Sequence, residues 1–223
     1  MHRKLKYDMH MKYLLRRGGL AAVLLFLAVA VEAAPPVSKE RNAQQARELF
    51  NEVYNKVFGP KGCTLAYSIN IIGIYKTAGT VTMRQKKIHY TEKRYHAWSD
   101  GKTLYRVDTK KKEVDIFDPN KVNKDNMASK YTYDLNKFNY SWSSAKEGIV
   151  LNIDAPSGSG GIRHAKSIID RKTHNPLALK VKVAFIWTTV KLSGFRTGGI
   201  DDRVFIFPRQ KFASYKFNDK RNE

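Results

Sequence analysis

Few residues in this 223-residue chain have the types and spacing that catalysis or metal binding needs. The histidines beyond the first thirty residues are His89, His96, His164 and His174. None of them has another histidine, a cysteine or a carboxylate at a metal-ligand spacing. Asp201 and Asp202 are adjacent in an expected turn, where neighbouring side chains diverge, so they do not predict the opposed carboxylates of a glycosidase. The sequence therefore predicts neither a metal site nor a catalytic carboxylate pair.

The chain also lacks the short motifs of common enzyme classes. It contains no G-x-S-x-G elbow, no Walker loop and no Rossmann glycine set. Cys63 is the only cysteine, which excludes an internal disulfide and predicts a small buried hydrophobe rather than a nucleophile. We predict a protein that is not an enzyme and has no cofactor. A hydrolase whose catalytic residues meet only in space is an alternative.

The N-terminal segment has the pattern of a secretory signal peptide. Residues 3–17 are basic, Leu20–Val31 is an apolar run, and Val31-Glu32-Ala33 places small residues at the two cleavage-critical positions. The run is shorter than the roughly 20 residues of a spanning helix. We expect cleavage after Ala33, with a signal anchor as the alternative. The predicted organisation is a signal peptide over 1–33, a tether over 34–41, one domain over 42–218 and a charged tail over 219–223.

The charge balance is strongly basic. Lysine and arginine number 41 against 20 acidic residues, which gives a formal net charge of +21. Such an excess attracts polyanions, including anionic membrane surfaces. Export argues against nucleic acid as a partner. Because the lysines are dispersed, as in Lys110–Lys112, a solvated surface is favoured over a dedicated anion site.

Asn42–Phe58 is the strongest helix pattern in the chain. Its apolar side chains recur at three- and four-residue steps, and Gly59-Pro60 ends it. The wide apolar stripe could cover a sheet. It consists of Ala46, Leu49, Phe50, Val53, Tyr54, Val57 and Phe58.

Tyr95–Phe117 predicts three consecutive antiparallel strands. A two-residue turn at Asp100-Gly101 would place Trp98 opposite Thr103. Period-two alternation then separates an apolar face from a charged face. The apolar face carries Trp98, Thr103, Tyr105, Val107, Val114 and Ile116. The charged face carries Asp108, Glu113 and the cross-strand pair of Arg106 with Asp115.

The rest of the chain adds further strand patterns and no helix that could connect parallel strands. A turn over Lys76–Gly79 separates the first two strands, residues 118–136 form a loop, and residues 155–161 form a linker. The expected strands are Thr64–Tyr75, Thr80–Tyr90, Lys137–Trp142, Gly148–Asp154, Arg163–Arg171, Leu177–Phe185, Trp187–Phe195 and Val204–Phe207. The predicted fold class is mainly β (α+β), with about ten antiparallel strands behind one helix.

One helix is too narrow to cover so large an apolar sheet face. Either the sheet closes into a sandwich, or it curls and leaves a cavity whose aromatic and β-branched lining suits an acyl chain. The predicted cavity lining is Trp98, Tyr105, Val107, Val114, Ile116, Val181, Val183 and, from the helix, Phe50. The alternative is that these side chains pack on the helix as ordinary core.

At this point the chain resembles the LolA-like family of outer-membrane lipoprotein carriers, most closely its divergent Bacteroidetes-type branch. Besides the signal peptide and helix, three segments carry the resemblance. Thr82–Tyr90 is similar to a family strand with an Arg-Pro and a downstream aromatic. Ser99–Tyr105 matches the S-D-G-x-x-L-[WY] turn, and Asp201–Phe207 resembles the closing F-x-F strand.

The resemblance implies an unclosed half-barrel, a curled antiparallel sheet covered by the N-terminal helix and short lid elements. It also implies a periplasmic carrier that binds the acyl chains of lipoproteins in a hydrophobic cavity and passes them toward the outer membrane. Arg84 matches the family arginine that holds the lid closed in the empty state, although Gln85 replaces the proline that follows it. The implied partners are acylated lipoproteins or another lipid, an inner-membrane release machinery and an outer-membrane acceptor, and we expect a monomer. The alternative is an envelope sensor or a polyanion- or glycan-binding module on the same scaffold.

Overall fold

The computed structural model describes residues 41–71, 75–121, 135–157, 163–183 and 186–222, without the side chains of Val183 and Ile186. The predicted signal peptide lies outside these residues, as do all of the tether except Arg41 and most of the predicted loop 118–136. The division into segments stays a prediction. Within the described part of the chain, no helix has the length and apolar character needed to cross a membrane.

The predicted helix is confirmed as α3 (Arg41–Phe58). Five of the seven expected apolar residues are buried, Leu49 and Tyr54 are partly buried, and Arg47 is an unexpected buried member. The Gly59 N–H donates to the Asn55 carbonyl at 2.9 Å and closes the last turn. Pro60 follows, and it cannot continue the helical hydrogen bonding.

All the described strands belong to one twelve-stranded sheet with the order β12-β6-β5-β4-β3-β2-β1-β11-β10-β9-β8-β7. The first six are β1 (Cys63–Ile71), β2 (Tyr75–Arg84), β3 (Lys87–Glu92), β4 (Tyr95–Ser99), β5 (Leu104–Asp108) and β6 (Glu113–Phe117). The others are β7 (Asn139–Ala145), β8 (Gly148–Asp154), β9 (His164–Ile169), β10 (Pro176–Val183), β11 (Ile186–Thr197) and β12 (Lys216–Asp219).

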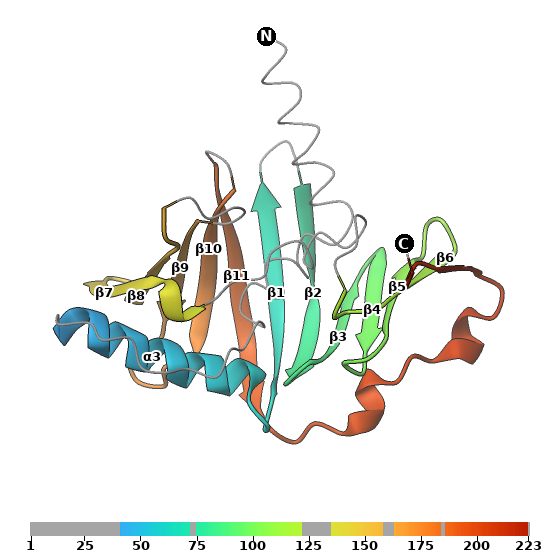
Figure 1. Cartoon of the computed structure of the whole chain (residues 1–223), viewed down its shortest axis with the longest axis horizontal. Helices are drawn as coiled ribbons and strands as arrows, with labels where there is room; N and C mark the ends of the chain where they lie inside the picture. Colours follow the sequence, from blue (N-terminus) through green and yellow to red (C-terminus); the bar gives the residue numbers. More distant parts are fainter. Residues whose placement is uncertain (1–40, 72–74, 122–134, 158–162, 184–185, 223) are drawn as a thin grey trace, which may run out of the picture.

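The sheet is curled and unclosed, as predicted. Its two edges are β12 and β7, which do not pair with each other. Neighbouring strands of the described sheet are antiparallel, except that β12 runs parallel to β6. Figure 1 shows α3 crossing the β7–β11 end of the sheet, while the C-terminal segment runs along the β3–β6 end. The predicted fold class is therefore confirmed, with one parallel strand added at an edge.

The core lies mainly between α3 and one face of the sheet, which we name the α3 face. Alternate residues of β1 point into it, from Cys63 to Ile71. They meet Phe50, Val53 and Val57 of the helix in one buried cluster. A second, separate cluster lies around β4–β6 and contains Trp98, Val107, Val114 and Phe212.

The structure corrects the strand predicted over Thr80–Tyr90. It is divided into the end of β2 and the start of β3, with Gln85 between them at a φ of 53°. The pairing of Met83 with Ile88 across this turn explains why the sequence alternation changes phase there. The predicted turn at Lys76–Gly79 is also wrong, because these residues pair with β1 inside β2.

In the β4–β6 meander, the predicted turn at Asp100-Gly101 is longer than expected. Ser99 pairs with Leu104, so the connection spans residues 100–103, and Trp98 lies opposite Tyr105 instead of Thr103. The Asp100 side chain accepts hydrogen bonds from the Lys102 and Thr103 amides at 2.8 Å, which stabilises this wider loop. The cross-strand pairing of Arg106 with Asp115 is as predicted.

The strand predicted over Val204–Phe207 is not present. The structure has 3₁₀-helices η3 (Asp202–Phe205) and η4 (Arg209–Phe212) there, and the last strand is β12. Asp201 caps η3 by accepting from the Arg203 amide. This capping interaction competes with the extended conformation that the apolar residues alone suggest. A further 3₁₀-helix, η2 (Leu135–Lys137), precedes β7.

Candidate functional site

The predicted cavity lining divides between the two faces of the sheet. Phe50 and Val181 are buried in the core cluster of the α3 face. Trp98, Val107 and Val114 belong to the second cluster instead. Since side chains alternate along a strand, β10 and the meander present their predicted linings to opposite sides. The structure therefore does not bring the predicted residues together into one surface.

Of the remaining predicted lining residues, the two on the meander lie on the same face as the second cluster. Tyr105 packs against the second cluster, and Ile116 is buried on the same side of β6 as Val114. Val183 pairs with Ile186, and its side chain lies outside the described set. On the α3 face the meander instead contributes Ala97, Leu104 and Phe117 to the core cluster, and none of these three belongs to the predicted lining.

The second cluster is covered by the chain's own C-terminal residues 200–219, which we name the C-terminal strap. The Phe207 ring stacks on Tyr105, with centroids 4.3 Å apart and planes at 6°. The Phe212 ring centroid lies 5.7 Å from that of Trp98 and 5.5 Å from that of Phe207. Strap and meander thus form an aromatic layer on the face opposite α3.

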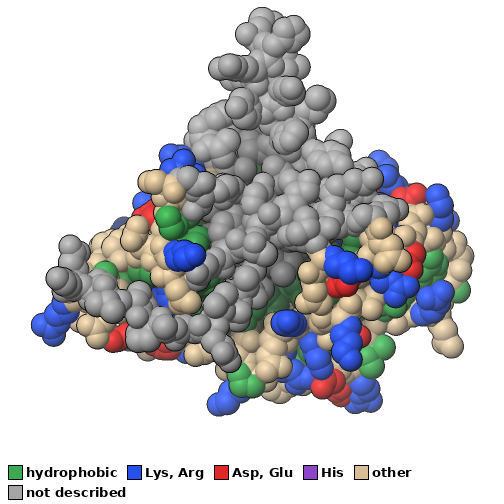
Figure 2. Space-filling view, in the orientation of Figure 1, with side chains coloured by type: hydrophobic (Ala, Val, Ile, Leu, Met, Phe, Trp, Pro, Cys, Tyr) green, Lys and Arg blue, Asp and Glu red, His purple; other side chains and the backbone are tan. Residues whose placement is uncertain are grey.

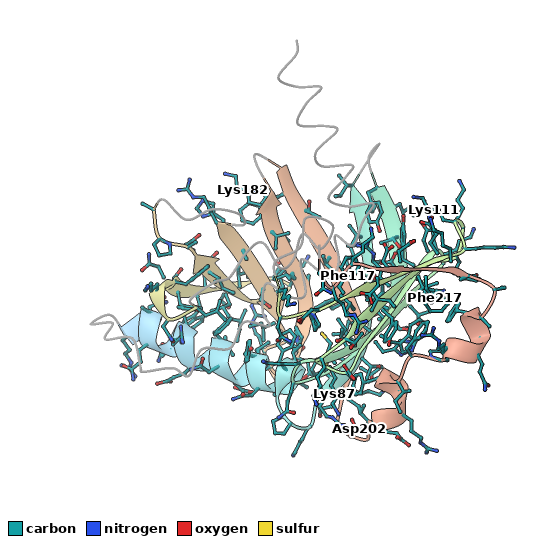
Figure 3. All side chains as sticks on the ribbon, turned by 45° about the vertical axis from the view of Figure 1, so that its right-hand side comes forward. Lys87, Lys111, Phe117, Lys182, Asp202 and Phe217 are labelled. Carbon is teal, nitrogen blue, oxygen red and sulfur yellow. The ribbon has the colours of Figure 1, made fainter. Side chains whose placement is uncertain are left out.

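Arg84 attaches the start of the strap to the sheet. One guanidinium nitrogen donates to the Ile200 carbonyl at 3.0 Å, and the other pairs with Asp202. Lys87 also reaches Asp202, at 2.6 Å, and this hydrogen bond and Arg84 hold the pKa of the Asp202 carboxyl below its usual value. Figure 3 labels Lys87 and Asp202 close together at this end of the sheet. The described polar contacts of Arg84 are therefore with the strap.

A polar network lies within the α3 face at β1–β3. The buried Glu92 carboxylate accepts hydrogen bonds from the Tyr67 hydroxyl at 2.6 Å and from Thr77 at 2.9 Å. Burial raises the pKa of Glu92, and these donors partly oppose the shift. Gly79 leaves room for the pair, because a Cβ there would lie 2.9 Å from the Tyr67 hydroxyl. No sequence motif marks this network; the isolated Glu at an inward strand position is its only signal.

The β5–β6 part of the α3 face holds the predicted charge pair. Arg106 and Asp115 meet at 2.7 Å and are mostly buried. The Arg106 guanidinium also lies 4.8 Å from the Phe117 ring centroid. The face that was predicted to be charged therefore lies on the core side. Its charged residues are tolerated there because they form an ion pair and a cation–π contact.

The described histidines lie in three separate places. His89 and His96 stack beside Trp98, with ring centroids 4.9 and 6.0 Å away, while His164 pairs with Asp154 and His174 with Glu52. Within the described residues no group of three or more His, Cys, Asp or Glu could hold a metal ion.

The Cys63 thiol is poorly suited to act as a nucleophile. It is fully buried in the core cluster, and burial raises its pKa to about 12. A thiol with such a pKa is almost entirely protonated at neutral pH, whereas the thiolate is the reactive form.

No family model matches the chain, and neither does any curated protein. Among solved structures it is similar to an uncharacterized conserved protein from Thermus thermophilus, at 10% identity and a TM-score of 0.56, over 79% of this chain and 100% of that one. It is also similar to a LolA superfamily protein from Nitrosomonas europaea, at 7% identity and a TM-score of 0.40, over 73% and 97%. A putative outer membrane lipoprotein-sorting protein domain from Vibrio parahaemolyticus matches at 12% identity and a TM-score of 0.36, over 77% and 99%.

The likeness to the Thermus protein shows a shared fold. The architecture itself is the one that the LolA resemblance implies, an unclosed, curled sheet with an amphipathic helix on one face.

Proposed function

We propose that the protein is a non-enzymatic carrier that binds the acyl chains of lipoproteins, or of another lipid, against the α3 face of its sheet. The supporting observation is that the apolar face of the sheet is wider than the helix that packs on it. The core cluster of this face extends to Leu104 on β5 and Phe117 on β6, whereas α3 packs chiefly on β7. An unclosed sheet with an apolar face wider than its helix is suited to accept an apolar guest.

The energetics require a surface of this kind. Burying one methylene contributes about 0.8 kcal/mol, so a 16-carbon chain in water carries a cost on the order of 12 kcal/mol. A carrier must offset much of this cost and still release its cargo. A site on the face of an unclosed sheet meets both needs, because no closed barrel has to unfold for the guest to leave.

The test is direct binding. The chain from residue 34 onward, purified from its own cell envelope, is examined by native mass spectrometry for a co-purified lipid. The delipidated protein is then titrated with a 16-carbon fluorescent fatty acid and with a triacylated peptide. We expect dissociation constants in the micromolar range or tighter that hardly change with salt. Absence of both co-purified lipid and probe binding would contradict the proposal.

A polyanion- or glycan-binding module is the second candidate, and the charge of the chain favours it. Basic side chains exceed acidic ones over the described surface visible in Figure 2. Such a module would bind with an affinity that falls steeply as salt rises, because exposed charges are screened. Salt dependence therefore separates it from the carrier. Export to the periplasm and the partners named above are part of the carrier proposal, and fractionation of cells tests the location.

A further inference from the structure

The sheet face opposite α3 carries a cluster of lysines on β9, β10 and β11. Lys166 and Lys180 are direct cross-strand partners, and Lys182 pairs with Trp187. These side chains point away from α3, because Val181 between Lys180 and Lys182 is buried in the core cluster. Lys191 follows Trp187 by four residues and shares its side of β11. We name these five residues the lysine face: Lys166, Lys180, Lys182, Trp187 and Lys191.

Packing does not account for the lysine face. Like charges directly opposite each other on neighbouring strands are destabilising, as with Lys166 and Lys180. Among the described residues, none of the four lysines lies within ion-pair distance of a carboxylate. The acidic residue that points outward on the adjacent β8 is Asp154, and it pairs with His164 at 2.7 Å.

The other end of the sheet is different. Two arginines there have carboxylate partners: Arg94 pairs with Asp108 at 2.6 Å and, on the α3 face, Arg106 pairs with Asp115 at 2.7 Å. Within its described residues, one sheet therefore neutralises these cations at the β4–β6 end and leaves the lysines unpaired at the β9–β11 end. The like-charge pair of Lys166 with Lys180 and the lack of described carboxylate partners favour an anionic partner outside the chain.

Trp187 identifies the class of that partner. It is 42% exposed, whereas Trp98 is only 7% exposed. The Lys166 ammonium lies 5.2 Å from the Trp187 ring centroid. An exposed indole beside lysines whose aliphatic stems can extend along an apolar layer is typical of contact with the membrane interface.

We propose that the lysine face docks the protein on an anionic phospholipid surface, with Trp187 inserted at the headgroup level. Each lysine near such a surface contributes about 1 kcal/mol, equivalent to about fivefold in affinity. Docking by this face leaves the α3 face turned away from the bilayer. The proposal does not depend on the proposed function, because a sheet of this charge pattern would dock with or without a lipid guest.

The test uses the chain from residue 34 onward and lipid vesicles of phosphatidylcholine alone or with about one third phosphatidylglycerol. We expect binding only to the anionic vesicles. The double variant Lys180→Gln/Lys182→Gln should weaken this binding at least about tenfold. The matched control is Lys110→Gln/Lys111→Gln, which removes the same charge from the exposed β5–β6 turn and should change binding less than about threefold. Figure 3 shows Lys182 and Lys111 at opposite ends of the sheet.

A second readout reports on Trp187. Its emission should shift to shorter wavelength on anionic vesicles, and Trp187→Phe should remove the shift although Trp98 and Trp142 remain. Equal losses in the two double variants would overturn the proposal in favour of diffuse net charge. Binding to heparin without binding to the vesicles would overturn it in favour of a soluble polyanion. The fatty-acid titration, performed without vesicles, reports on cargo binding independently.

Discussion

At the scale of single residues, the least expected feature is Glu92, a carboxylate in the α3 face with no cation beside it among its described contacts. Tyr67 and Thr77 donate to it, and these donors stabilise the ionised form without neutralising it. Burial is the larger effect and raises the Glu92 pKa above the ordinary value of 4.5. Folding therefore favours the protonated acid relative to the unfolded chain.

This shift predicts a pH dependence of stability that one substitution should remove. Because the folded pKa lies above the unfolded one, the stabilisation from the Glu92 proton is complete below about pH 4.5 and is lost as pH rises through the folded pKa. For one proton the slope of the free energy of unfolding is at most about 1.4 kcal/mol per pH unit. In Glu92→Gln this part of the slope should disappear.

Urea unfolding at half-unit steps from about pH 4 to 7 measures the effect. The matched control is Glu147→Gln, at an exposed glutamate in the β7–β8 turn, which should keep the slope of the parent protein. If the parent and Glu92→Gln have the same slope, the carboxylate is not held in the buried environment described above.

At the scale of elements, the C-terminal strap is fixed to the sheet at both ends, by Arg84 at its start and by β12 at its finish. We expect Arg84→Gln to loosen the start of the strap, because the Ile200 carbonyl loses a charged donor worth about 1.5–3 kcal/mol. Amide exchange over residues 200–212 should become faster, and Trp98 emission should shift to longer wavelength.

Hydrogen exchange with mass spectrometry measures this change, and Arg203→Gln is the matched control. Arg203 pairs only with its neighbour Asp201 among the described contacts and its side chain is 85% exposed, so its loss should leave the strap unchanged. The lid function implied by the family resemblance makes a different prediction. It requires Arg84→Gln to alter the affinity for a fatty-acid probe, whereas a strap contact alone leaves that affinity as it was.

The helix and most of the strands could be predicted from the sequence, whereas the C-terminal strap could not. Period and end signals predicted α3 and most strands because each pattern is local. The change of alternation phase between Met83 and Ile88 was a visible signal of a turn, which Gln85 provides. The strap could not be predicted in this way, since the two-residue spacing of Phe205 and Phe207 wrongly indicated a strand and the five aromatic residues together follow no single period. Their positions are Phe205, Phe207, Phe212, Tyr215 and Phe217.

At the scale of the whole molecule, the sequence could not decide which face of the meander points to α3. The alternation of side chains along the strands defines two faces of the meander, but it does not show which of them points toward the helix. The strap decides it by covering Trp98 and Val107, so the meander's Leu104 and Phe117 face the core side. On β10 the inner face could be predicted, because Lys180 and Lys182 alternate with Val181 and mark the solvent-facing side.

The division into two faces predicts different outcomes for two chemically identical substitutions. Val181 and Val114 are both 0% exposed, the first in the core cluster and the second under the strap. Each change to alanine removes the two methyl groups of a buried valine and should lower the free energy of unfolding by about 2 kcal/mol. If the α3 face binds acyl chains, only Val181→Ala should weaken binding of the fatty-acid probe, by about fivefold.

Thermal or urea unfolding and probe titration on both variants measure this pair of effects. Equal losses of affinity would mean that binding follows general stability, and an affinity loss in Val114→Ala alone would place the guest under the strap. Either result would contradict the assignment of the cargo surface to the α3 face.

The parallel pairing of β12 with β6 links the end of the chain to a strand made about a hundred residues earlier. During synthesis or export from the N-terminus, the meander is complete long before the residues that cover it appear. Until then Trp98, Tyr105 and Val107 are uncovered, and β6 is a bare sheet edge that can recruit a second molecule. The C-terminal strap therefore protects this face and edge from self-association. A chain that stops near residue 199 should aggregate at concentrations where the whole chain stays monodisperse.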